Sequence, residues 1–198
     1  MAIIVDKVQK RKDIALACKD LFLEKGFKQL TISDVAKTAG VGKGTVYEYF
    51  QNKEDIIFEI VNILISIHDE RKIKQMQQVN TAREKIKVFA RFFYNQEDSE
   101  LRKLYKEFIS ISLIDGNPQM IALETYLFHK YLEWFESLIQ EGIDKGELIP
   151  EAMNLSQGLF ISGDGFFIKS SLTKDAIDLE KELCNYVDAI FKLIEVKK

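Results

Sequence analysis

The sequence has 198 residues, of which 46% are hydrophobic and 30% are charged, and its formal net charge is −3. This composition can bury a core, which excludes wholesale disorder. With only 2 prolines and 10 glycines, the chain has too few turn residues for a many-stranded β-sandwich or β-barrel. We therefore expect an all-α protein.

The distribution of cysteine and charge narrows the class of protein further. Cys18 and Cys184 lie far apart and outside any CxxC pair, which is typical of a reducing compartment. The longest uncharged stretch, Ala152–Gly163, has 12 residues, whereas a transmembrane helix needs about 20 apolar ones. Residues 1–55 carry a net charge of +2 and residues 56–198 one of −5. We expect a cytoplasmic protein without membrane contact, whose amino-terminal part is the better candidate for binding nucleic acid.

Hydrophobic periodicity predicts the helices in chain order. A first helix over about residues 12–25 has one apolar face and ends at Gly26. A second begins after Thr31, which forms a T-x-x-D capping box with Asp34, and it stops at Gly40. A third covers about residues 43–49. Asn52 caps a fourth, which runs to about Arg71. Five more are expected, for about nine in total, over residues 82–94, 100–114, 119–141, 152–171 and 175–195.

Residues 32–50 meet the packing requirements of a helix-turn-helix. These are apolar residues on the inner faces of both helices, a small residue where the helices cross, and a turn residue that tolerates positive φ. The requirements are met by Val35, Ala36, Ala39, Gly40, Val41, Val46 and Tyr49. The outward positions of the third helix suit contact with a DNA groove and with phosphates: Lys43, Gly44, Thr45, Tyr47 and Glu48.

With these residues, segment 12–56 closely resembles the TetR family of bacterial transcriptional regulators. The resemblance is carried, in the family's order and spacing, by Ala17, Phe22, Gly26-Phe27, Thr31, Val35-Ala36, Ala39-Gly40-Val41, Lys43 to Tyr47, Tyr49-Phe50 and Lys53-Glu54. It implies a DNA-binding domain over residues 1–52 with a three-helix head, and a helical ligand-binding and dimerisation domain over residues 53–198. It also implies a homodimer that represses transcription at palindromic operator DNA until a small molecule binds.

The family's DNA contacts carry over position by position. Ser33, Lys43, Gly44 and Tyr47 align with base-reading or groove-facing sites. Thr31, Thr45, Tyr49 and Lys53 align with phosphate-contacting sites. Gly42 stands where the family commonly has serine or threonine, so a hydroxyl cap and the phosphate contact there are missing. Glu48 either accepts a hydrogen bond from cytosine N4 or points to solvent.

The sequence contains no recognisable set of catalytic residues. The segment Gly40–Thr45 superficially resembles a phosphate-binding loop, but Lys37 replaces the first glycine and Gly44 follows the lysine. His68 and His129 lack the partners of a helical metal site. We expect no enzymatic activity, no metal and no cofactor.

The aromatic residues of the carboxy-terminal domain are either a plain core or the wall of a ligand cavity. On the second interpretation the effector is small and largely apolar or aromatic. The candidate ligand-binding residues are Phe89, Phe93, Phe108, Tyr126, His129, Trp134 and Asp164.

Small residues recur along the helix over residues 152–171, at Gly158, Ser162 and Gly165. Such a stripe allows close helix approach, and the resemblance implies a dimer built from the last two helices of each subunit. Packing within one chain is the alternative. The candidate interface residues are Leu155, Gly158, Leu159, Ser162, Phe166, Tyr186, Val187 and Ile190.

Two other functional classes remain open at the level of sequence. One is a helix-turn-helix activator or architectural DNA-binding protein that takes no ligand. The other is a helical small-molecule-binding protein that does not bind DNA. A palindromic footprint on DNA and an effector that releases it distinguish the three.

Overall fold

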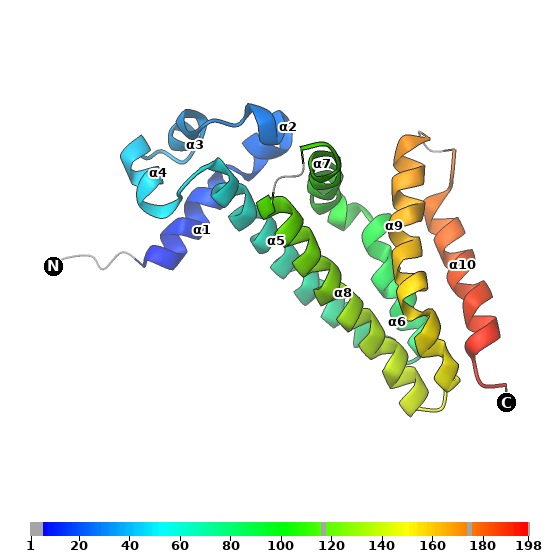
Figure 1. Ribbon diagram of the computed structural model, residues 1–198. Coiled ribbons are helices and arrows are strands. Elements are labelled where there is room, and N and C mark those ends of the chain that lie inside the picture. Colours follow the sequence, from blue (N-terminus) through cyan, green and yellow to red (C-terminus); the bar gives the residue numbers. More distant parts are fainter. Residues whose placement is uncertain (1–5, 116–117, 174–175, 198) are drawn as a thin grey trace. The chain divides into compact units, whose positions relative to one another are not determined.

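The computed structural model describes residues 6–115, 118–173 and 176–197 (Figure 1). Within these ranges the chain forms ten α-helices and three short 3-10 helices, and its β-structure is confined to one isolated bridge between Leu148 and Glu195. The expected all-α class is therefore confirmed. The helices are α1 (Lys7–Ala17), α2 (Lys19–Gln29), α3 (Ile32–Thr38), α4 (Lys43–Tyr49), α5 (Lys53–Met76), α6 (Ala82–Ala90), α7 (Ser99–Asp115), α8 (Pro118–Asp144), α9 (Ser156–Leu172) and α10 (Leu179–Ile194). The 3-10 helices are η1 (Arg91–Phe93), η2 (Gln96–Asp98) and η3 (Pro150–Leu155).

The predicted helix over residues 12–25 ends at Gly26 as expected, since Gly26 has a non-helical backbone with φ 74°. Its predicted continuity is wrong, because the chain breaks at Cys18. Cys18 has φ −96° and ψ −1°, and its N–H bonds to the carbonyls of Ala15 and Leu16. Its side chain is fully buried, with Sγ 3.7 Å from the carbonyl oxygen of Val35. Burial raises the pKa of this thiol to about 11, so Cys18 is a core residue rather than a reactive cysteine.

The capping box predicted before α3 is present. The N–H of Asp34 donates to Thr31 Oγ1 at 3.2 Å, and the N–H of Thr31 donates to Asp34 Oδ2, also at 3.2 Å. Hydrogen bonds from Thr31 and Lys25 lower the pKa of Asp34. Asn52 likewise caps α5 by accepting from the Asp55 N–H at 2.8 Å. These local signals place the starts of α3 and α5 at the residues expected.

The chain divides into two compact units. The first holds the described residues up to Asp69 together with Lys103–Ser110, and the second holds Glu70–Arg102 and Ile111–Lys198. The first unit thus extends beyond residue 52, since Ile56, Ile57 and Ile60 of α5 are fully buried. In the second unit, α6 packs against α8 and α10, and α9 packs against the same two helices. Their buried core includes Ile86, Phe135, Ile139, Val187 and Phe191.

Candidate functional site

Helices α3 and α4 pack together across a turn that depends on Gly40. This residue has φ 64°, in the left-handed region that favours glycine. The next residue, Val41, donates its N–H to the carbonyl of Ala36 at 3.0 Å and closes the turn. Val35, Ala36 and Val46 are buried where the two helices meet. The structure therefore has the helix-turn-helix that residues 32–50 predict.

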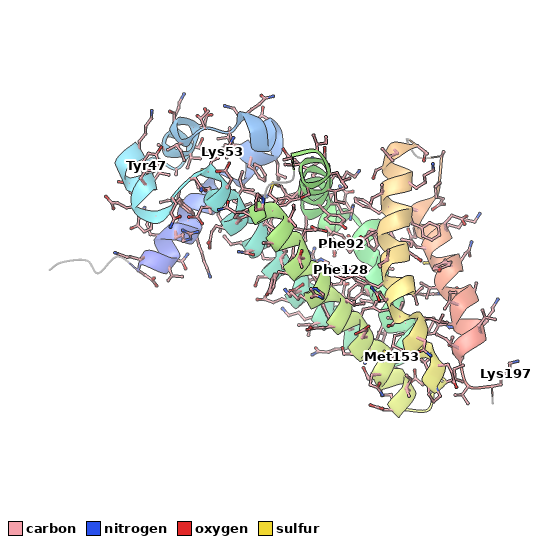
Figure 2. All side chains as sticks on the ribbon, in the orientation of Figure 1. Tyr47, Lys53, Phe92, Phe128, Met153 and Lys197 are labelled. Atoms are coloured by element: carbon pink, nitrogen blue, oxygen red, sulfur yellow. The ribbon has the colours of Figure 1, made fainter. Side chains whose placement is uncertain are left out.

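The opposite face of α4 is turned to solvent. Lys43, Gly44 and Glu48 are exposed, and Tyr47 is 59% exposed (Figure 2). A Cβ atom added to Gly44 would meet nothing within 4 Å. Because this face packs against nothing in its own unit, it is free to approach a partner, and a two-turn helix of this kind fits the major groove.

The other predicted DNA contacts surround this face with less exposure. Thr45 and Tyr49 are half-buried on α4, whereas Ser33 is exposed on α3. The hydroxyl of Thr31 already serves the α3 capping box, where it also donates to Asp34 Oδ2 at 2.8 Å. Lys53 is half-buried in the first turn of α5 (Figure 2).

Arg11 holds this unit together and was missed at the level of sequence. Its guanidinium bonds to Asp55 Oδ1 at 2.7 Å, to Glu59 Oε2 at 2.8 Å and to the carbonyl oxygen of Tyr49. It also lies 4.3 Å from the ring centroid of Phe50. Partial burial alone would raise the pKa of Asp55, but the hydrogen bond from Arg11 and that from the Gln51 N–H lower it overall.

Arg11 therefore ties α1 to the end of α4 and to the start of α5. No sequence signal reveals this role, since its partners lie 38 to 48 residues away.

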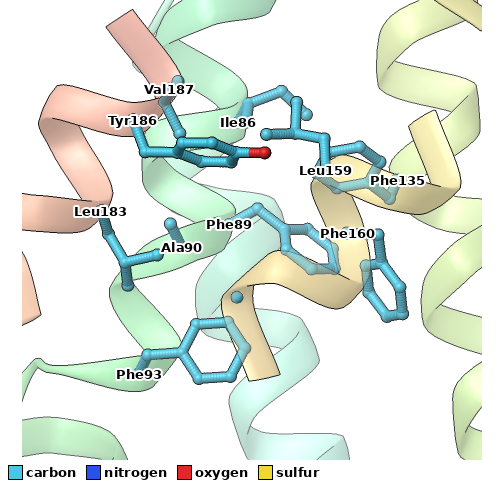
Figure 3. Close-up of a pocket in the computed structure, with 11 residues that line it drawn as sticks. Ile86, Phe89, Ala90, Phe93, Phe135, Leu159, Phe160, Leu183, Tyr186 and Val187 are labelled. Atoms are coloured by element: carbon cyan, nitrogen blue, oxygen red, sulfur yellow. The ribbon is translucent and has the colours of Figure 1, made fainter. Parts of the chain in front are cut away.

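The second unit contains a small apolar cavity of about 30 Å³ (Figure 3). The described residues that line it come from α6, η1, α8, α9 and α10, and the only polar side chain among them is Tyr186. Its hydroxyl, drawn in red in Figure 3, lies 3.2 Å from Ser162 Oγ. The lining is Ile86, Phe89, Ala90, Phe93, Phe135, Leu159, Phe160, Gly163, Leu183, Tyr186 and Val187.

The structure brings only some of the predicted ligand-binding residues to this cavity. Phe89 and Phe93 line it. Trp134 stands behind the lining, with its ring centroid 5.5 Å from that of Phe89. Asp164 is half-buried next to Gly163. Burial, and then the charge of Asp164, raise the pKa of Glu124 on α8.

The remaining three candidates lie away from the cavity lining. Tyr126 is 60% exposed and His129 is exposed, both on α8. Phe108 belongs to the first unit, where it is buried with its ring centroid 6.2 Å from that of Phe58. These residues were selected because they are aromatic or polar, and residue type alone does not show which side chains tertiary packing brings to a cavity.

Helix α9 presents an exposed apolar face next to the predicted interface positions. Leu159 and Val187, proposed for the interface, are instead buried within their own unit, and Leu155 is 45% exposed. Ser162, Phe166, Tyr186 and Ile190 are half-buried. The exposed face has alternating spacings of three and four residues, as in a helix seam. Its members are Gly158, Ile161, Gly165, Ile168 and Leu172.

A protein-family model described as "Bacterial regulatory proteins, tetR family" matches residues 14–60, a segment that contains α3 and α4. Over 144 residues the chain is 28% identical to the fatty acid metabolism regulator protein of Bacillus subtilis, covering 72% of each chain. A TetR-family regulator from Cytophaga hutchinsonii superposes with a TM-score of 0.81 at 18% identity, covering 98% of this chain and 99% of that one. The fatty acid degradation regulator FadR of Bacillus halodurans superposes with a TM-score of 0.68 at 25% identity, covering 92% and 94%.

This chain belongs to the TetR family. It is a transcriptional regulator rather than an enzyme, as its relatives are named. In this TetR-family member, the helix-turn-helix is made by α3 and α4, and the apolar cavity lies in the second unit. Among the described residues no cluster of histidine, cysteine or carboxylate side chains could hold a metal ion. No helix in the same part of the chain combines the length and hydropathy that a membrane span requires.

Proposed function

We propose that the protein is a homodimeric repressor that binds palindromic operator DNA through α4 and is released by a small apolar or aromatic effector. The observation that supports this most is the outward face of α4, which is exposed and open at Gly44. A two-fold dimer would place two α4 helices in successive major grooves, about 34–36 Å apart. Such a regulator works in the cytoplasm, where the chromosome lies.

An effector releases the operator if it binds better to a dimer whose α4 helices are differently spaced. The coupling free energy between effector binding and DNA binding is typically about 1–3 kcal/mol. Helix α5 is the candidate element for transmitting this change, since its residues contribute to both compact units. The lining of the cavity, apolar apart from the Tyr186 hydroxyl, favours an effector with an uncharged apolar part. Two relatives are named as regulators of fatty acid metabolism and degradation, which supports an aliphatic effector.

Binding to operator DNA is the first test of this function. The purified protein should bind a palindromic fragment from near its own gene, with an affinity that falls as salt rises because phosphate counterions are released. Fluorescence anisotropy across a salt series measures this. Absence of salt-sensitive binding to any such fragment, without effector, would refute the proposal.

Lys43→Ala should weaken operator binding by about 30-fold or more, since each base contact is worth about 1–3 kcal/mol and the dimer has two. It should also relax the preference for one base pair in each half-site, which binding to a set of single-site operator variants measures. Lys74→Ala is the matched control, because Lys74 is an exposed lysine on α5 outside the proposed interface. Equal losses in the two variants would mean that Lys43 contributes only general charge.

The exposed face of α9 is our proposed dimer surface. Ile161, 45% exposed, occupies its middle, and the glycines at 158 and 165 leave open space on either side. Ile161→Glu should raise the dimer dissociation constant by about 100-fold or more, because a buried carboxylate without a partner costs several kcal/mol. Analytical ultracentrifugation measures this.

Ile73→Glu provides the control for the dimer test, since Ile73 is 49% exposed on α5. It should leave the dimer intact. A dimer that persists unchanged in Ile161→Glu would place the interface elsewhere.

A DNA-binding activator or architectural protein without a ligand is the alternative. It shares the α4 interface, so only the effector distinguishes it. Operator binding that no apolar compound weakens would favour this alternative.

A further inference from the structure

The cavity is too small for an ordinary effector. Its volume is about 30 Å³, whereas drug-sized ligands occupy pockets of about 300–1,000 Å³. A protein cavity that binds benzene has a volume of about 150 Å³. A ligand can therefore enter this site only if one of the lining side chains moves out of its present position.

The ring of Phe93 occupies a place that only a glycine at position 163 allows. A Cβ atom added to Gly163 would lie 2.5 Å from Phe93 Cε2, well inside van der Waals contact. The ring therefore rests directly on the backbone of α9, and Figure 3 shows it at one end of the cavity. The ring also approaches Phe167, four residues after Gly163 on the same helix, at a centroid distance of 5.7 Å.

The backbone that carries Phe93 is less regular than the backbone that carries Phe89 or Phe135. Phe89 lies on α6 and packs edge-on against Trp134 and Phe135, both at 5.5 Å. Phe135 lies on α8 and is 3% exposed. Phe93 is half-buried at the end of η1, a three-residue 3-10 helix, whose hydrogen-bond geometry is poorer than that of an α-helix. The ring packs against Phe92 at a centroid distance of 5.2 Å, and its weaker backbone support makes Phe93 our candidate for the side chain that moves.

We propose that Phe93, seated against Gly163, sets the size limit of the ligand that the cavity admits. The part of the ligand that enters takes the place of the phenyl ring, so it is an uncharged ring or a short aliphatic segment of similar volume. This inference rests on the proposed effector site, because it assigns the residue that determines specificity there.

Benzene is the appropriate probe, since Phe93→Ala removes a group of the same size. Trp134 is the only tryptophan of the chain and contacts Phe89 of the lining, so its fluorescence reports occupancy without DNA. Phe93→Ala should bind benzene at least 10-fold more tightly than the unmodified protein, and benzene should raise its melting temperature. Phe93→Leu keeps more of the apolar volume and should show a smaller gain in affinity, which preserves the test if the alanine variant does not fold.

Phe92→Ala is the matched control, because Phe92 lies beside Phe93 on η1 but is absent from the lining. It should bind benzene no better than the unmodified protein. The proposal is overturned if the unmodified protein or Phe92→Ala binds benzene as tightly as Phe93→Ala, or if a folded Phe93 variant shows no gain. Since the readout needs no operator, a failure of DNA binding would refute the proposed repressor while leaving the role of Phe93 intact.

Discussion

Gly44→Ala is expected to weaken operator binding by about 30-fold or more while making the protein more stable. The added methyl group meets nothing within 4 Å in the protein, and alanine favours a helix over glycine by about 1 kcal/mol. In the complex, the same methyl group would stand between α4 and the groove in both subunits. A loss of about 1–3 kcal/mol in each half-site amounts to about 30-fold or more for the dimer.

The prediction combines a loss of operator affinity with a gain in stability, so misfolding cannot account for it. Chemical denaturation measures stability, and fluorescence anisotropy measures operator affinity. A variant that lost affinity through misfolding would lose both. Ser66→Ala is the control, since Ser66 is exposed on α5 and its replacement also favours a helix. Full affinity in Gly44→Ala would show that this part of α4 does not approach DNA.

Asp98→Ala is expected to lower the free energy of unfolding by about 3–5 kcal/mol, as when one partner of a buried ion pair is removed. The Asp98 side chain is fully buried, with Oδ1 2.9 Å from Arg71 Nη2 and Oδ2 3.9 Å from Lys72 Nζ. Lys72 is itself 1% exposed, and its Nζ donates to the Val88 carbonyl at 2.7 Å. These contacts join α5, α6 and η2 within the second unit. Chemical denaturation at fixed protein concentration measures the loss.

Lys72→Met is the companion variant and should cost less, because Asp98 keeps its 2.9 Å contact with Arg71 and methionine fills the space of the buried lysine stem. Burial lowers the pKa of Lys72 from its usual 10.5 to about 8. Between these values the unfolded chain binds the proton and the folded protein does not, so Lys72 makes stability rise with pH in this window. Lys72→Met should lack that rise between about pH 8 and 10. An Asp98→Ala loss below about 1 kcal/mol would mean that water already solvates the cluster.

Local chemistry was sufficient to predict much of the amino-terminal unit. The capping box of Thr31 and Asp34, the cap at Asn52 and the left-handed Gly40 act over a few residues, so their pattern is visible in the chain itself. The bounds of α4 also follow from such signals. Because the helix-turn-helix needs only this local pattern, its outward positions could be named without the structure.

Contacts between distant residues could not be predicted in this way. The role of Arg11 depends on partners that are 38 to 48 residues away, and buried Cys18 contacts Val35, 17 residues further along the chain. The same reason applies to the candidate ligand-binding residues, selected by residue type, and to the candidate interface residues, selected from a helical stripe. Neither signal shows what covers a side chain, which tertiary packing decides. Thus Leu159 and Val187 are buried while Ile161 and Leu172 are exposed. The seating of Phe93 against Gly163 likewise exists only where η1 meets α9.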